Sequence, residues 1–561
     1  MNAGILNALS AAISDDPSHV LQLRKIVVAL AISGRLKQSD KLISPDDLRA
    51  MLKGAKSRLV AQRILPKQKP WLPITDEQMP EEFSDPSLFI SLGQVARVEK
   101  GKTGIQQAKP GDYPLVVTAA ERLTADHYDF DSAAAIVPLV SSTGHGNASI
   151  NRLHYQEGPF ALGTILAAVL PHDPALFSAR FLFEYLSAFK DELLVSRMSG
   201  TANVTLTLGR IEAVPIPLVP PLVQRQVDEL MALCDQLETA RTERETKRDR
   251  LATASLARLN SPDPETFRDD ARFALDALPA LTARPDQIKQ VRQTILNLAV
   301  RGKLVPQDPA DEPAEELLKR IAEERAARSR VGTIPKPKIT SRDVNRFSEG
   351  LPIGWSPVGL GDVCDLVTSG SRGWAEYYAD SGPGFVRAQN IRFGRMRLDD
   401  LAFVKPPSNS EGSRTQVYKN DLLIVITGAG VTNPALLERD LGEAYVSQHV
   451  GLARPSDSSL SPWLLLCLMA DAGGRGELIE CAYGAGKPGL NLDNIRSLSV
   501  PLPPFAEQQR IVAKVDELMA LCDQLEASLT GADETRSKLL DALLAEALAP
   551  VDAVALQAAA E

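Results

Sequence analysis

Two long stretches of the chain carry apolar residues at spacings that alternate between four and three. The first has Val223, Val227, Leu230, Cys234 and Leu237, and the second has Ile511, Val515, Leu518, Cys522, Leu525 and Leu529. This spacing is typical of a helix that packs along a heptad seam against another helix. Pro503-Pro504 precedes the second stretch, and Asn260-Ser-Pro-Asp-Pro264 ends the first. We therefore predict two long helices, because proline is tolerated at a helix start and breaks a helix interior.

Shorter apolar patterns predict the remaining elements. Further helices are expected at about 177–194, 286–304 and 315–328, and a linker at 335–338. Buried strands are expected at 115–118, 135–140 and 164–170, and again at 421–427, 442–446 and 498–502. The two regions that lie between the helical parts are therefore predicted to be mixed α/β.

Part of the sequence occurs twice. Val227–Glu238 recurs letter for letter as Val515–Glu526, and Leu30–Leu36 is similar to Leu298–Leu304. A proline-rich segment precedes each long helix, whereas the two inserts between these repeated parts look different. Such a pattern indicates one duplicated framework that presents two different recognition surfaces. The two helices can pair antiparallel within the chain and relate its halves by a pseudo-twofold axis. A homodimeric coiled coil or ordinary core packing is the alternative.

Composition narrows the class of protein. The chain has 561 residues and a net charge of −9 at pH 7, so any contact with nucleic acid needs local basic patches. No apolar run reaches the ~20 residues of a membrane span, and the first residues carry no basic leader. The 5 cysteines show no C-x-x-C spacing, which argues against a disulfide framework or a zinc finger. We expect a cytoplasmic protein of several domains.

The chain lacks the motifs of common catalytic sites. Gly484-Ala-Gly-Lys487 resembles a phosphate loop, but Cys481 stands where that motif needs Gly and Pro488 where it needs Ser or Thr. Thr432-Asn-Pro-Ala435 lacks the second proline and the aromatic residue of the amino-methyltransferase motif. The sequence contains no H-E-x-x-H pair and no G-x-S-x-G turn. We expect no catalysis by this chain, and no metal ion or cofactor bound to it.

Basic and amide side chains gather in loops of both inserts. Arginine reads guanine and asparagine or glutamine reads adenine through paired hydrogen bonds, and glycine-rich loops let phosphates approach the backbone. The candidates for DNA contact in the first insert are Lys102, Thr103, Gln106, Lys109, Ser142, His145, Asn147 and Ser149. Those in the second are Ser371, Arg372, Trp374, Gln389, Asn390, Arg392, Arg395, Gln448, His449 and Lys487. For any one of them, a solvated face or an ordinary turn is the alternative.

Several segments resemble the specificity (S) subunit of type I restriction–modification systems. Residues 501–511 with the repeated dodecamer look like the start of the family's long helix, and residues 298–307 look like its arm. Leu351-Pro-Ile-Gly-Trp355 with Leu360–Val363 looks like the opening of a target recognition domain, and 144–149 and 442–449 look like segments within such domains. The first half departs from this pattern, because its insert opens with Met79–Phe83.

The resemblance implies an architecture. Two mixed α/β target recognition domains would be joined by two long antiparallel coiled-coil helices in a pseudo-twofold repeat. The implied boundaries are a helical arm at 1–68, a recognition domain at 69–221, a central helix with a second arm at 222–332, a recognition domain at 345–504 and a final helix at 505–561. The seam between the helices would consist of Val227, Leu230, Cys234, Leu237, Val515, Leu518, Cys522 and Leu525.

The resemblance also implies a function. Each recognition domain would read one half of a bipartite site in double-stranded DNA, and the paired helices would set the spacer and dock two methyltransferase subunits. Restriction subunits would join these, and S-adenosylmethionine, ATP and magnesium would belong to the partner subunits. Two other functions stay open at this point: a phage-defence scaffold whose inserts bind protein partners, and a fused nuclease or methyltransferase.

Overall fold

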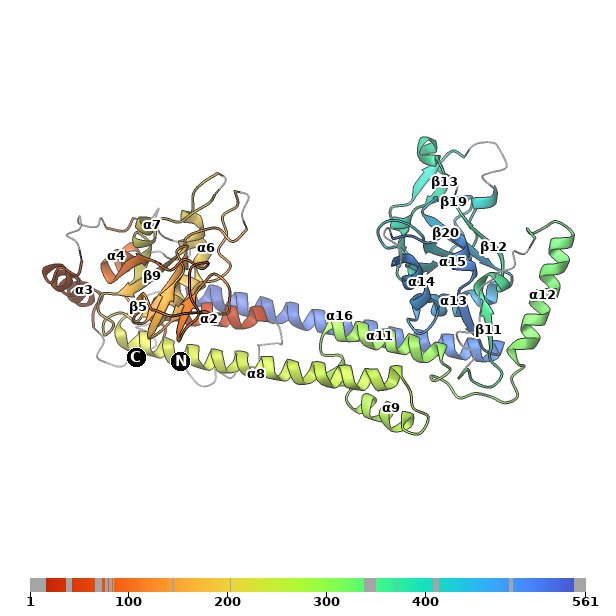
Figure 1. Ribbon diagram of the computed structural model, residues 1–561, viewed down its shortest axis with the longest axis horizontal. Helices are drawn as coiled ribbons and strands as arrows, with labels where there is room; N and C mark the ends of the chain where they lie inside the picture. The colour runs from red at the N-terminus through yellow and green to blue at the C-terminus, as the bar shows by residue number, and fades with distance from the viewer. Residues whose placement is uncertain are drawn as a thin grey trace, which may run out of the picture. The chain divides into compact units, whose positions relative to one another are not determined.

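The computed structural model describes residues 17–36, 43–65, 73–75, 79, 83, 85–143, 146–201, 203–336, 350–370, 372–406, 413–483 and 488–548. The chain divides into two compact units. Unit 1 comprises residues 1–246 and 531–561, and unit 2 comprises residues 247–530 (Figure 1). Two long helices, α8 (Pro221–Asn260) and α16 (Phe505–Leu548), each contribute residues to both units.

Unit 1 contains a β-rich domain at residues 85–217, here called domain 1. Its outer pair is β1 (Phe89–Ser91) and β10 (Pro215–Pro217). An antiparallel sheet has the order β2–β9–β6–β7, with bounds Ala96–Lys100, Leu166–Pro171, Ala134–Pro138 and His154–Gln156. A second sheet has the order β4–β3–β8–β5, with bounds Leu123–Ala125, Tyr113–Val116, Pro159–Leu162 and Phe130–Asp131. Within it, β3 and β8 run parallel.

Unit 2 contains domain 2 at residues 356–502, which repeats this topology. The outer pair is β11 (Ser356–Gly359) and β21 (Ser499–Leu502). The four-stranded sheet has the order β12–β20–β17–β18, with bounds Cys364–Ser369, Val450–Pro455, Leu422–Val425 and Pro434–Leu436. The smaller sheet has the order β16–β13–β19, with bounds Ala402–Val404, Tyr378–Val386 and Ala444–Val446, and β13 and β19 run parallel.

The two inserts therefore share one fold, although their sequences differ as expected. Each strand of domain 2 in these three sheets has a counterpart in domain 1, at the same place in the strand order and with the same pairing sense. Buried positions tolerate many apolar substitutions as long as pattern and volume are kept. One fold can therefore persist after its surface side chains have changed.

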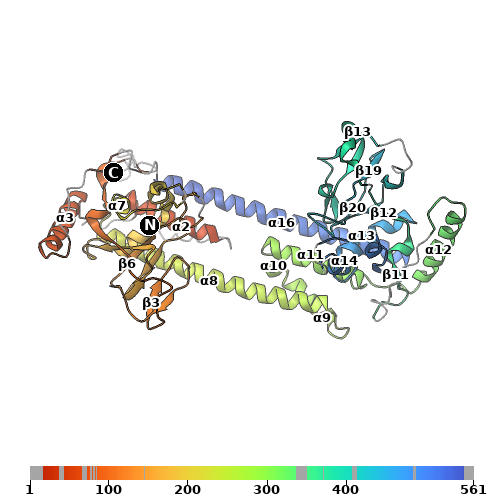
Figure 2. The ribbon, with the colours of Figure 1, turned by 45° about the horizontal axis from the view of Figure 1, so that its top comes forward.

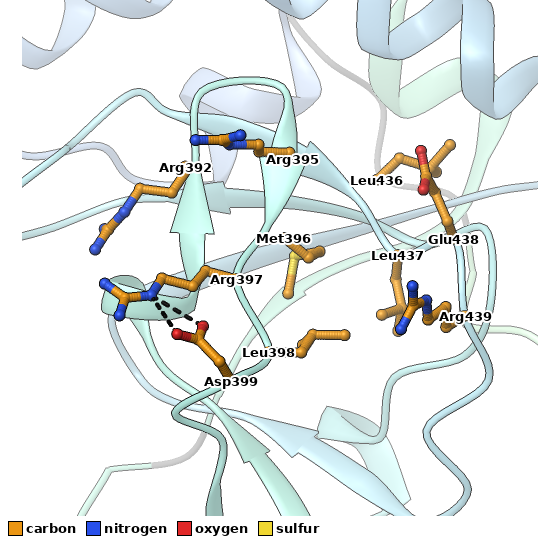
Figure 3. A pocket seen from close by; sticks show the side chains of 10 residues that line it. All are labelled: Arg392, Arg395, Met396, Arg397, Leu398, Asp399, Leu436, Leu437, Glu438 and Arg439. Atoms are coloured by element: carbon orange, nitrogen blue, oxygen red, sulfur yellow. Dashed lines mark hydrogen bonds and ion pairs between the residues drawn. The ribbon is translucent and has the colours of Figure 1, made fainter. Parts of the chain in front are cut away.

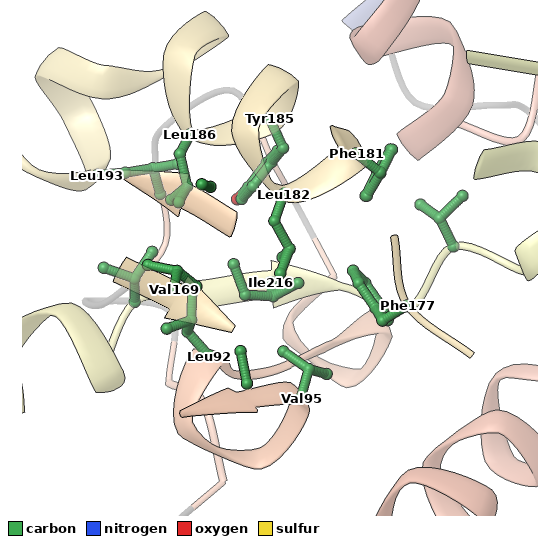
Figure 4. Packing of buried hydrophobic residues seen from close by; sticks show 14 of the residues in the cluster. Leu92, Val95, Val169, Phe177, Phe181, Leu182, Tyr185, Leu186, Leu193 and Ile216 are labelled. Carbon is green, nitrogen blue, oxygen red and sulfur yellow. The ribbon is translucent and has the colours of Figure 1, made fainter. Parts of the chain in front are cut away.

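Helices close the apolar faces of both domains. In domain 1, α5 (Ala179–Ala188) lies over the β2–β9–β6–β7 sheet, where Leu182 and Tyr185 pack with Val169 of β9 and Ile216 of β10 (Figure 4). The shorter helices of domain 1 are α4 (Leu92–Val95), α6 (Lys190–Leu193) and α7 (Leu208–Glu212). Domain 2 has α13 (Ser461–Met469), α14 (Gly474–Tyr483) and α15 (Leu492–Arg496).

Each unit also holds two arm helices that occupy corresponding places in the sequence. These are α2 (Pro17–Ile32) and α3 (Pro45–Ala61) in unit 1, and α11 (Pro285–Val300) and α12 (Ala314–Arg330) in unit 2. The similar segments 30–36 and 298–304 form the ends of α2 and α11. Gly34 and Gly302 have φ angles of 71° and 64° there. The following N–H groups, of Arg35 and Lys303, donate to the Leu30 and Leu298 carbonyls at 2.9 Å. The repeat therefore preserves a left-handed helix end, which favours glycine.

A second repeated motif marks the start of each domain. Leu92-Gly-Gln-Val95 in domain 1 corresponds to Leu360-Gly-Asp-Val363 in domain 2, at the same offset as the arms. The Lys56 ammonium of α3 donates to the Gly93 carbonyl at 2.6 Å, and the Arg325 guanidinium of α12 donates to the Gly361 carbonyl at 3.0 Å. Both domains are thus held to their arms through the same backbone group.

The predicted long helices and their ends are confirmed, as are the helices near 286–304 and 315–328. Each predicted strand overlaps an observed one, but the segment 177–194 is interrupted and forms α5 and α6. Two helices, α9 (Phe267–Asp276) and α10 (Leu278–Leu281), were not predicted, because they directly follow the proline-rich end of α8.

Candidate nucleic-acid interface

Each domain places a glycine turn directly after the first strand of its four-stranded sheet. Gly101 follows β2, and Gly370 follows β12. A Cβ atom on Gly101 would lie 2.2 Å from the Gly163 carbonyl oxygen, and one on Gly370 would lie 2.0 Å from that of Val446. Only glycine permits such an approach. The two turns, both predicted as DNA contacts, therefore lie at equivalent places, against the carboxyl ends of β8 and β19.

Thr103 fixes this turn in domain 1 from the inside. Its hydroxyl donates to the Asp129 carboxylate at 2.9 Å and lies 3.0 Å from His127 Nε2. The same Asp129 oxygen accepts from the Leu162 N–H of β8 at 2.8 Å. Thr103 is 5% exposed, so the prediction that it contacts DNA is wrong. The other ring nitrogen of His127, Nδ1, lies 2.9 Å from the Asp126 carboxylate. This hydrogen bond lowers the pKa of the Asp126 carboxyl group.

The other candidates of domain 1 surround this turn or lie in the β6–β7 loop. Lys102, Gln106 and Lys109 are exposed, and the Lys102 ammonium lies 5.4 Å from the centre of the Phe130 ring. In the β6–β7 loop, Ser142 and Asn147 are exposed and Ser149 is half-buried, and His145 lies outside the described residues. The Ser142 N–H donates to the Ser149 carbonyl at 2.9 Å, which closes this loop on itself.

The turn of domain 2 presents Arg372 to solvent but keeps Trp374 inside. Trp374 is 4% exposed, with its ring stacked 5.8 Å from Phe385 and 5.3 Å from Tyr445. The predicted contact of Trp374 with a DNA sugar is therefore wrong, because the ring belongs to the core of the smaller sheet. Arg372 is exposed on the same turn, and Ser371 lies outside the described residues.

Asn390 is a structural residue as well. Its side chain donates to the carbonyls of Arg397 and Asp400, at 3.0 and 2.9 Å, and accepts from the Arg387 N–H at 2.9 Å. Because it is 1% exposed, its predicted role in reading adenine is wrong. The neighbouring Gln389 is exposed, with its amide donating to the Asp400 carboxylate at 2.7 Å.

Two further candidates follow the parallel strand β19. Gln448 and His449 are exposed, and the Thr427 hydroxyl lies 2.6 Å from His449 Nδ1. This contact joins the end of β19 to the loop that connects β17 with β18. Lys487 lies outside the described residues.

The β17–β18 loop was not among the predicted contacts, although it is the counterpart of the β6–β7 loop. Gly428, Ala429 and Gly430 are exposed at its tip. Thr432 has a φ angle of 76°, rare for a β-branched residue, and its carbonyl accepts from Arg475 at 2.7 Å. Comparison of the strand orders of the two domains identifies this loop as a candidate. No motif in the sequence alone points to it.

Arg392 and Arg395 line a cavity of about 840 Å³ in domain 2. They belong to a hairpin formed by β14 (Ile391–Arg392) and β15 (Arg395–Met396). Two more arginines, Arg397 and Arg439, line the same cavity and were not among the predicted contacts (Figure 3). The Arg397 guanidinium donates to Asp399 at 2.9 Å and lowers the pKa of that carboxyl group.

The comparisons with known proteins agree with this geometry. A family model described as "Type I restriction modification DNA specificity domain" matches residues 352–530. Two Escherichia coli proteins, the type I restriction enzyme EcoEI and EcoAI specificity subunits, are each 26% identical to this chain. The alignments cover 94% of both chains for the first and 93% for the second. These matches support an S subunit, because the chain is similar over nearly its whole length to specificity subunits of type I restriction–modification systems.

A solved structure described as "Structural basis underlying complex assembly and conformational transition of the type I R-M system" is also similar to this chain. It is 17% identical, with 82% of this chain and 98% of that chain covered and a TM-score of 0.47.

The predicted seam residues of α8 and α16 pack in clusters that also contain the arms. Cys234 and Leu237 of α8 share a cluster with Leu23 and Ile26 of α2 and with Leu540 of α16. Val227 and Leu230 pack with the end of α2, and Val515, Leu518, Cys522 and Leu525 pack in the cluster that holds Ile288 and Ile295 of α11. These residues therefore pack with the arm helices, and Cys234 and Leu237 also share a cluster with α16. Figure 1 and Figure 2 show α2 beside the first part of α8. Pairing of the two long helices along the whole seam stays a prediction.

Matching ion pairs hold each arm to its long helix. In unit 1, Arg24 of α2 pairs with Asp235 and Glu238 of α8. In unit 2, Arg292 of α11 pairs with Asp523 and Glu526 of α16, at 2.6 and 2.8 Å. The four carboxylates occupy identical places in the two copies of the dodecamer.

The opposite side of each arm contacts the end of the other long helix. His19 of α2 lies 3.2 Å from the Ser537 hydroxyl of α16. Gln287 of α11 donates to the Asp249 carboxylate of α8 at 3.3 Å. His19 corresponds to Gln287 at the arm offset, and Ser537 corresponds to Asp249 at the dodecamer offset. The same contact scheme thus occurs in both units, with the roles of α8 and α16 exchanged.

Two features are absent from the part of the chain that the structure describes. Among its residues, no group of three or more His, Cys, Asp or Glu side chains is arranged to hold a metal ion. None of the helices in that part combines the length and apolar character needed to cross a bilayer.

Proposed function

We propose that this specificity subunit reads a bipartite site in double-stranded DNA, with one half read by each domain. The observation that carries the proposal is the chemical difference between equivalent turns. The segments Gly101-Lys-Thr-Gly104 and Gly370-Ser-Arg-Gly373 both come directly after the first strand of the four-stranded sheet, and Gly101 and Gly370 lie against the ends of the equivalent strands β8 and β19. A shared fold with unlike side chains at its exposed turns is expected of two domains that read different base sequences.

The two long helices set the distance between the half-sites in this proposal. They consist of 40 and 44 residues, or about 60 Å at 1.5 Å per residue, which exceeds the ~34 Å between half-sites one DNA turn apart. We further propose that they run antiparallel as a coiled coil with pseudo-twofold symmetry. The arm contacts support this arrangement. α2 contacts the first part of α8 and the last part of α16, whereas α11 contacts the first part of α16 and the last part of α8.

The repeated dodecamer supports docking of two identical partner chains. Leu233 and Leu521 occupy the same dodecamer position and are 43% and 47% exposed, so neither residue is retained for core packing. Identical exposed residues on two equivalent helices suit two copies of one partner. We propose that these are methyltransferase subunits, that restriction subunits join them in the cytoplasm, and that S-adenosylmethionine, ATP and magnesium bind to those partners. The specificity subunit itself would be non-catalytic.

Mapping of methylated bases in cells that contain the subunit and its methyltransferase tests the proposal. An Arg372→Ala variant should relax the sequence preference of one half-site only, with a loss of ~1–3 kcal/mol per bidentate base contact. Lys102→Ala is the matched variant for the other half-site. A phage-defence scaffold that binds proteins through its inserts predicts no bipartite methylation at all. Loss of both half-sites in each single variant would also contradict the proposal.

A further inference from the structure

The arginine-lined cavity lies on segments that are longer in domain 2 than in domain 1. Residues 117–122 connect β3 to β4 in domain 1, whereas residues 387–401, with the β14–β15 hairpin, make the equivalent connection in domain 2. The other wall follows β18 and spans 437–443, whereas its counterpart after β7 spans only 157–158. The cavity is therefore a feature of one half of the duplicated framework.

The lining of the cavity carries excess positive charge in a chain whose net charge is −9. Four guanidinium groups face the two carboxylates of Asp399 and Glu438, which leaves a net charge of +2. Arg397 is paired with Asp399. Arg392 also attracts the Asp399 carboxylate and helps to lower its pKa, without an ion pair at contact distance. Arg395 and Arg439 make no ion pair or side-chain hydrogen bond with the residues that the structure describes. Arg395 and Arg439 are thus available to an anionic ligand, with Arg392 beside them.

The arrangement of these side chains suits a group that lies between two walls. Figure 3 shows Arg392, Arg395 and Arg397 on the hairpin side and Arg439 beside Glu438 on the opposite side, with Met396 and Leu398 between them. An apolar floor displaces water and strengthens the attraction between a guanidinium group and an anion. Arginine holds phosphate oxygens through paired hydrogen bonds, which lysine does not do.

We infer that this cavity binds a phosphodiester group of the DNA backbone beside the half-site read by domain 2. The inference rests on the proposed function and adds a contact that anchors only one half of the complex. Docking of duplicated partner chains requires the same surface on both halves, and domain 1 lacks the longer segments. A contact with a backbone phosphate can be made at one half-site without an equivalent contact at the other. Such a contact positions the DNA and does not read its sequence.

The salt dependence of DNA binding tests this inference. The full subunit, assembled with its methyltransferase, would be titrated against a duplex that holds its mapped site at several KCl concentrations. Each phosphate contact contributes about −0.9 to the slope of log Kobs against log salt concentration. The affinity for DNA falls as KCl rises from 50 to 200 mM. In Arg439→Gln and in Arg395→Gln, the factor by which it falls should be about 3.5 times smaller than in the unchanged protein.

A charge change of opposite sign provides the internal control. Glu438→Gln removes a carboxylate from the cavity wall and should tighten the binding of DNA. Arg272→Gln on α9 removes the charge of an exposed arginine outside domain 2 and should leave the salt dependence unchanged. Both half-sites should remain the same in the methylation maps of all four variants.

Three results would overturn the inference. The first is an unchanged slope in both cavity variants. The second is an altered base preference at the domain 2 half-site, which would make these arginines base readers. The third is loss of methyltransferase from the purified complex, which would make the cavity a protein-binding surface. Absence of any bipartite site for the unchanged subunit would instead refute the proposed function, so the two failures can be told apart.

Discussion

Arg24 and Arg292 occupy equivalent places in the two arms, yet their replacement should have unequal effects. Each guanidinium group joins its arm to two carboxylates of a long helix. Arg24 lies in addition 3.6 Å from Glu184 of α5, whose side chain is 3% exposed. That carboxylate also pairs with Arg180 at 2.7 Å. The arm of unit 1 is therefore joined to domain 1 through a buried charge.

The burial of Glu184 sets the difference in magnitude. Asp523 and Glu526 are 71% and 48% exposed, so Arg292→Met should destabilise unit 2 by about 1 kcal/mol, as for exposed ion pairs. Burial already raises the pKa of Glu184. Arg24→Met leaves this carboxylate with one cation, and breaking a buried pair costs about 3–5 kcal/mol. Because Arg180 remains, we expect a loss of about 2–4 kcal/mol for unit 1.

Hydrogen exchange measured by mass spectrometry on the full chain separates the two units. Peptides from α2 and the first part of α8 report on Arg24→Met, and peptides from α11 and the first part of α16 report on Arg292→Met. The double variant Arg24→Met with Glu184→Gln should regain most of the lost protection, since the buried charge is gone. Equal losses in the two single variants, or no recovery in the double variant, would refute the reasoning.

Two further predictions concern the domains. Burial lowers the pKa of His154 to about 4, whereas an unfolded histidine titrates near 6.5. The folded state favours the neutral ring. The contribution of His154 to the free energy of unfolding is therefore fully present above pH 6.5, and up to about 3 kcal/mol is lost as the pH drops to 4. Urea unfolding at pH 7 and pH 5 should show a loss of about 2 kcal/mol between the two pH values, and His154→Gln should remove it. Trp374→Ala should cost about 3–5 kcal/mol as a core truncation, whereas Trp374→Phe should keep both fold and DNA binding. Loss of DNA binding in a stable Trp374→Phe protein would contradict its core role.

The framework was predictable because its signals are local or repeated. Heptad spacing located α8 and α16, and the proline segments located their starts. The identical dodecamers indicated duplication, and the structure extends this duplication to pairs such as Arg24 and Arg292. Leu92–Val95 was also visible in the sequence as a repeat of Leu360–Val363, but a four-residue match with three identities stands out only after the domains are aligned.

The candidate site was less predictable, because residue type does not determine burial. Thr103, Trp374 and Asn390 have side chains that suit DNA contact, but each is turned inward and satisfies a partner within its own domain. Arg439 joins Arg392 only because β18 passes the inserted hairpin. That proximity depends on the register of strands far apart in the sequence, which a single sequence does not disclose.

In the proposed function, the two long helices set the spacer between the half-sites. Four residues would be inserted in each helix, between Thr246 and Lys247 of α8 and between Thr530 and Gly531 of α16, where the packing passes from one unit to the other. The helices then lengthen by about 6 Å, which equals about two base pairs at 3.4 Å each. Methylation mapping should reveal both half-sites unchanged and a spacer about two base pairs longer. Unchanged half-sites with an unchanged spacer would show that the two helices do not set the spacer.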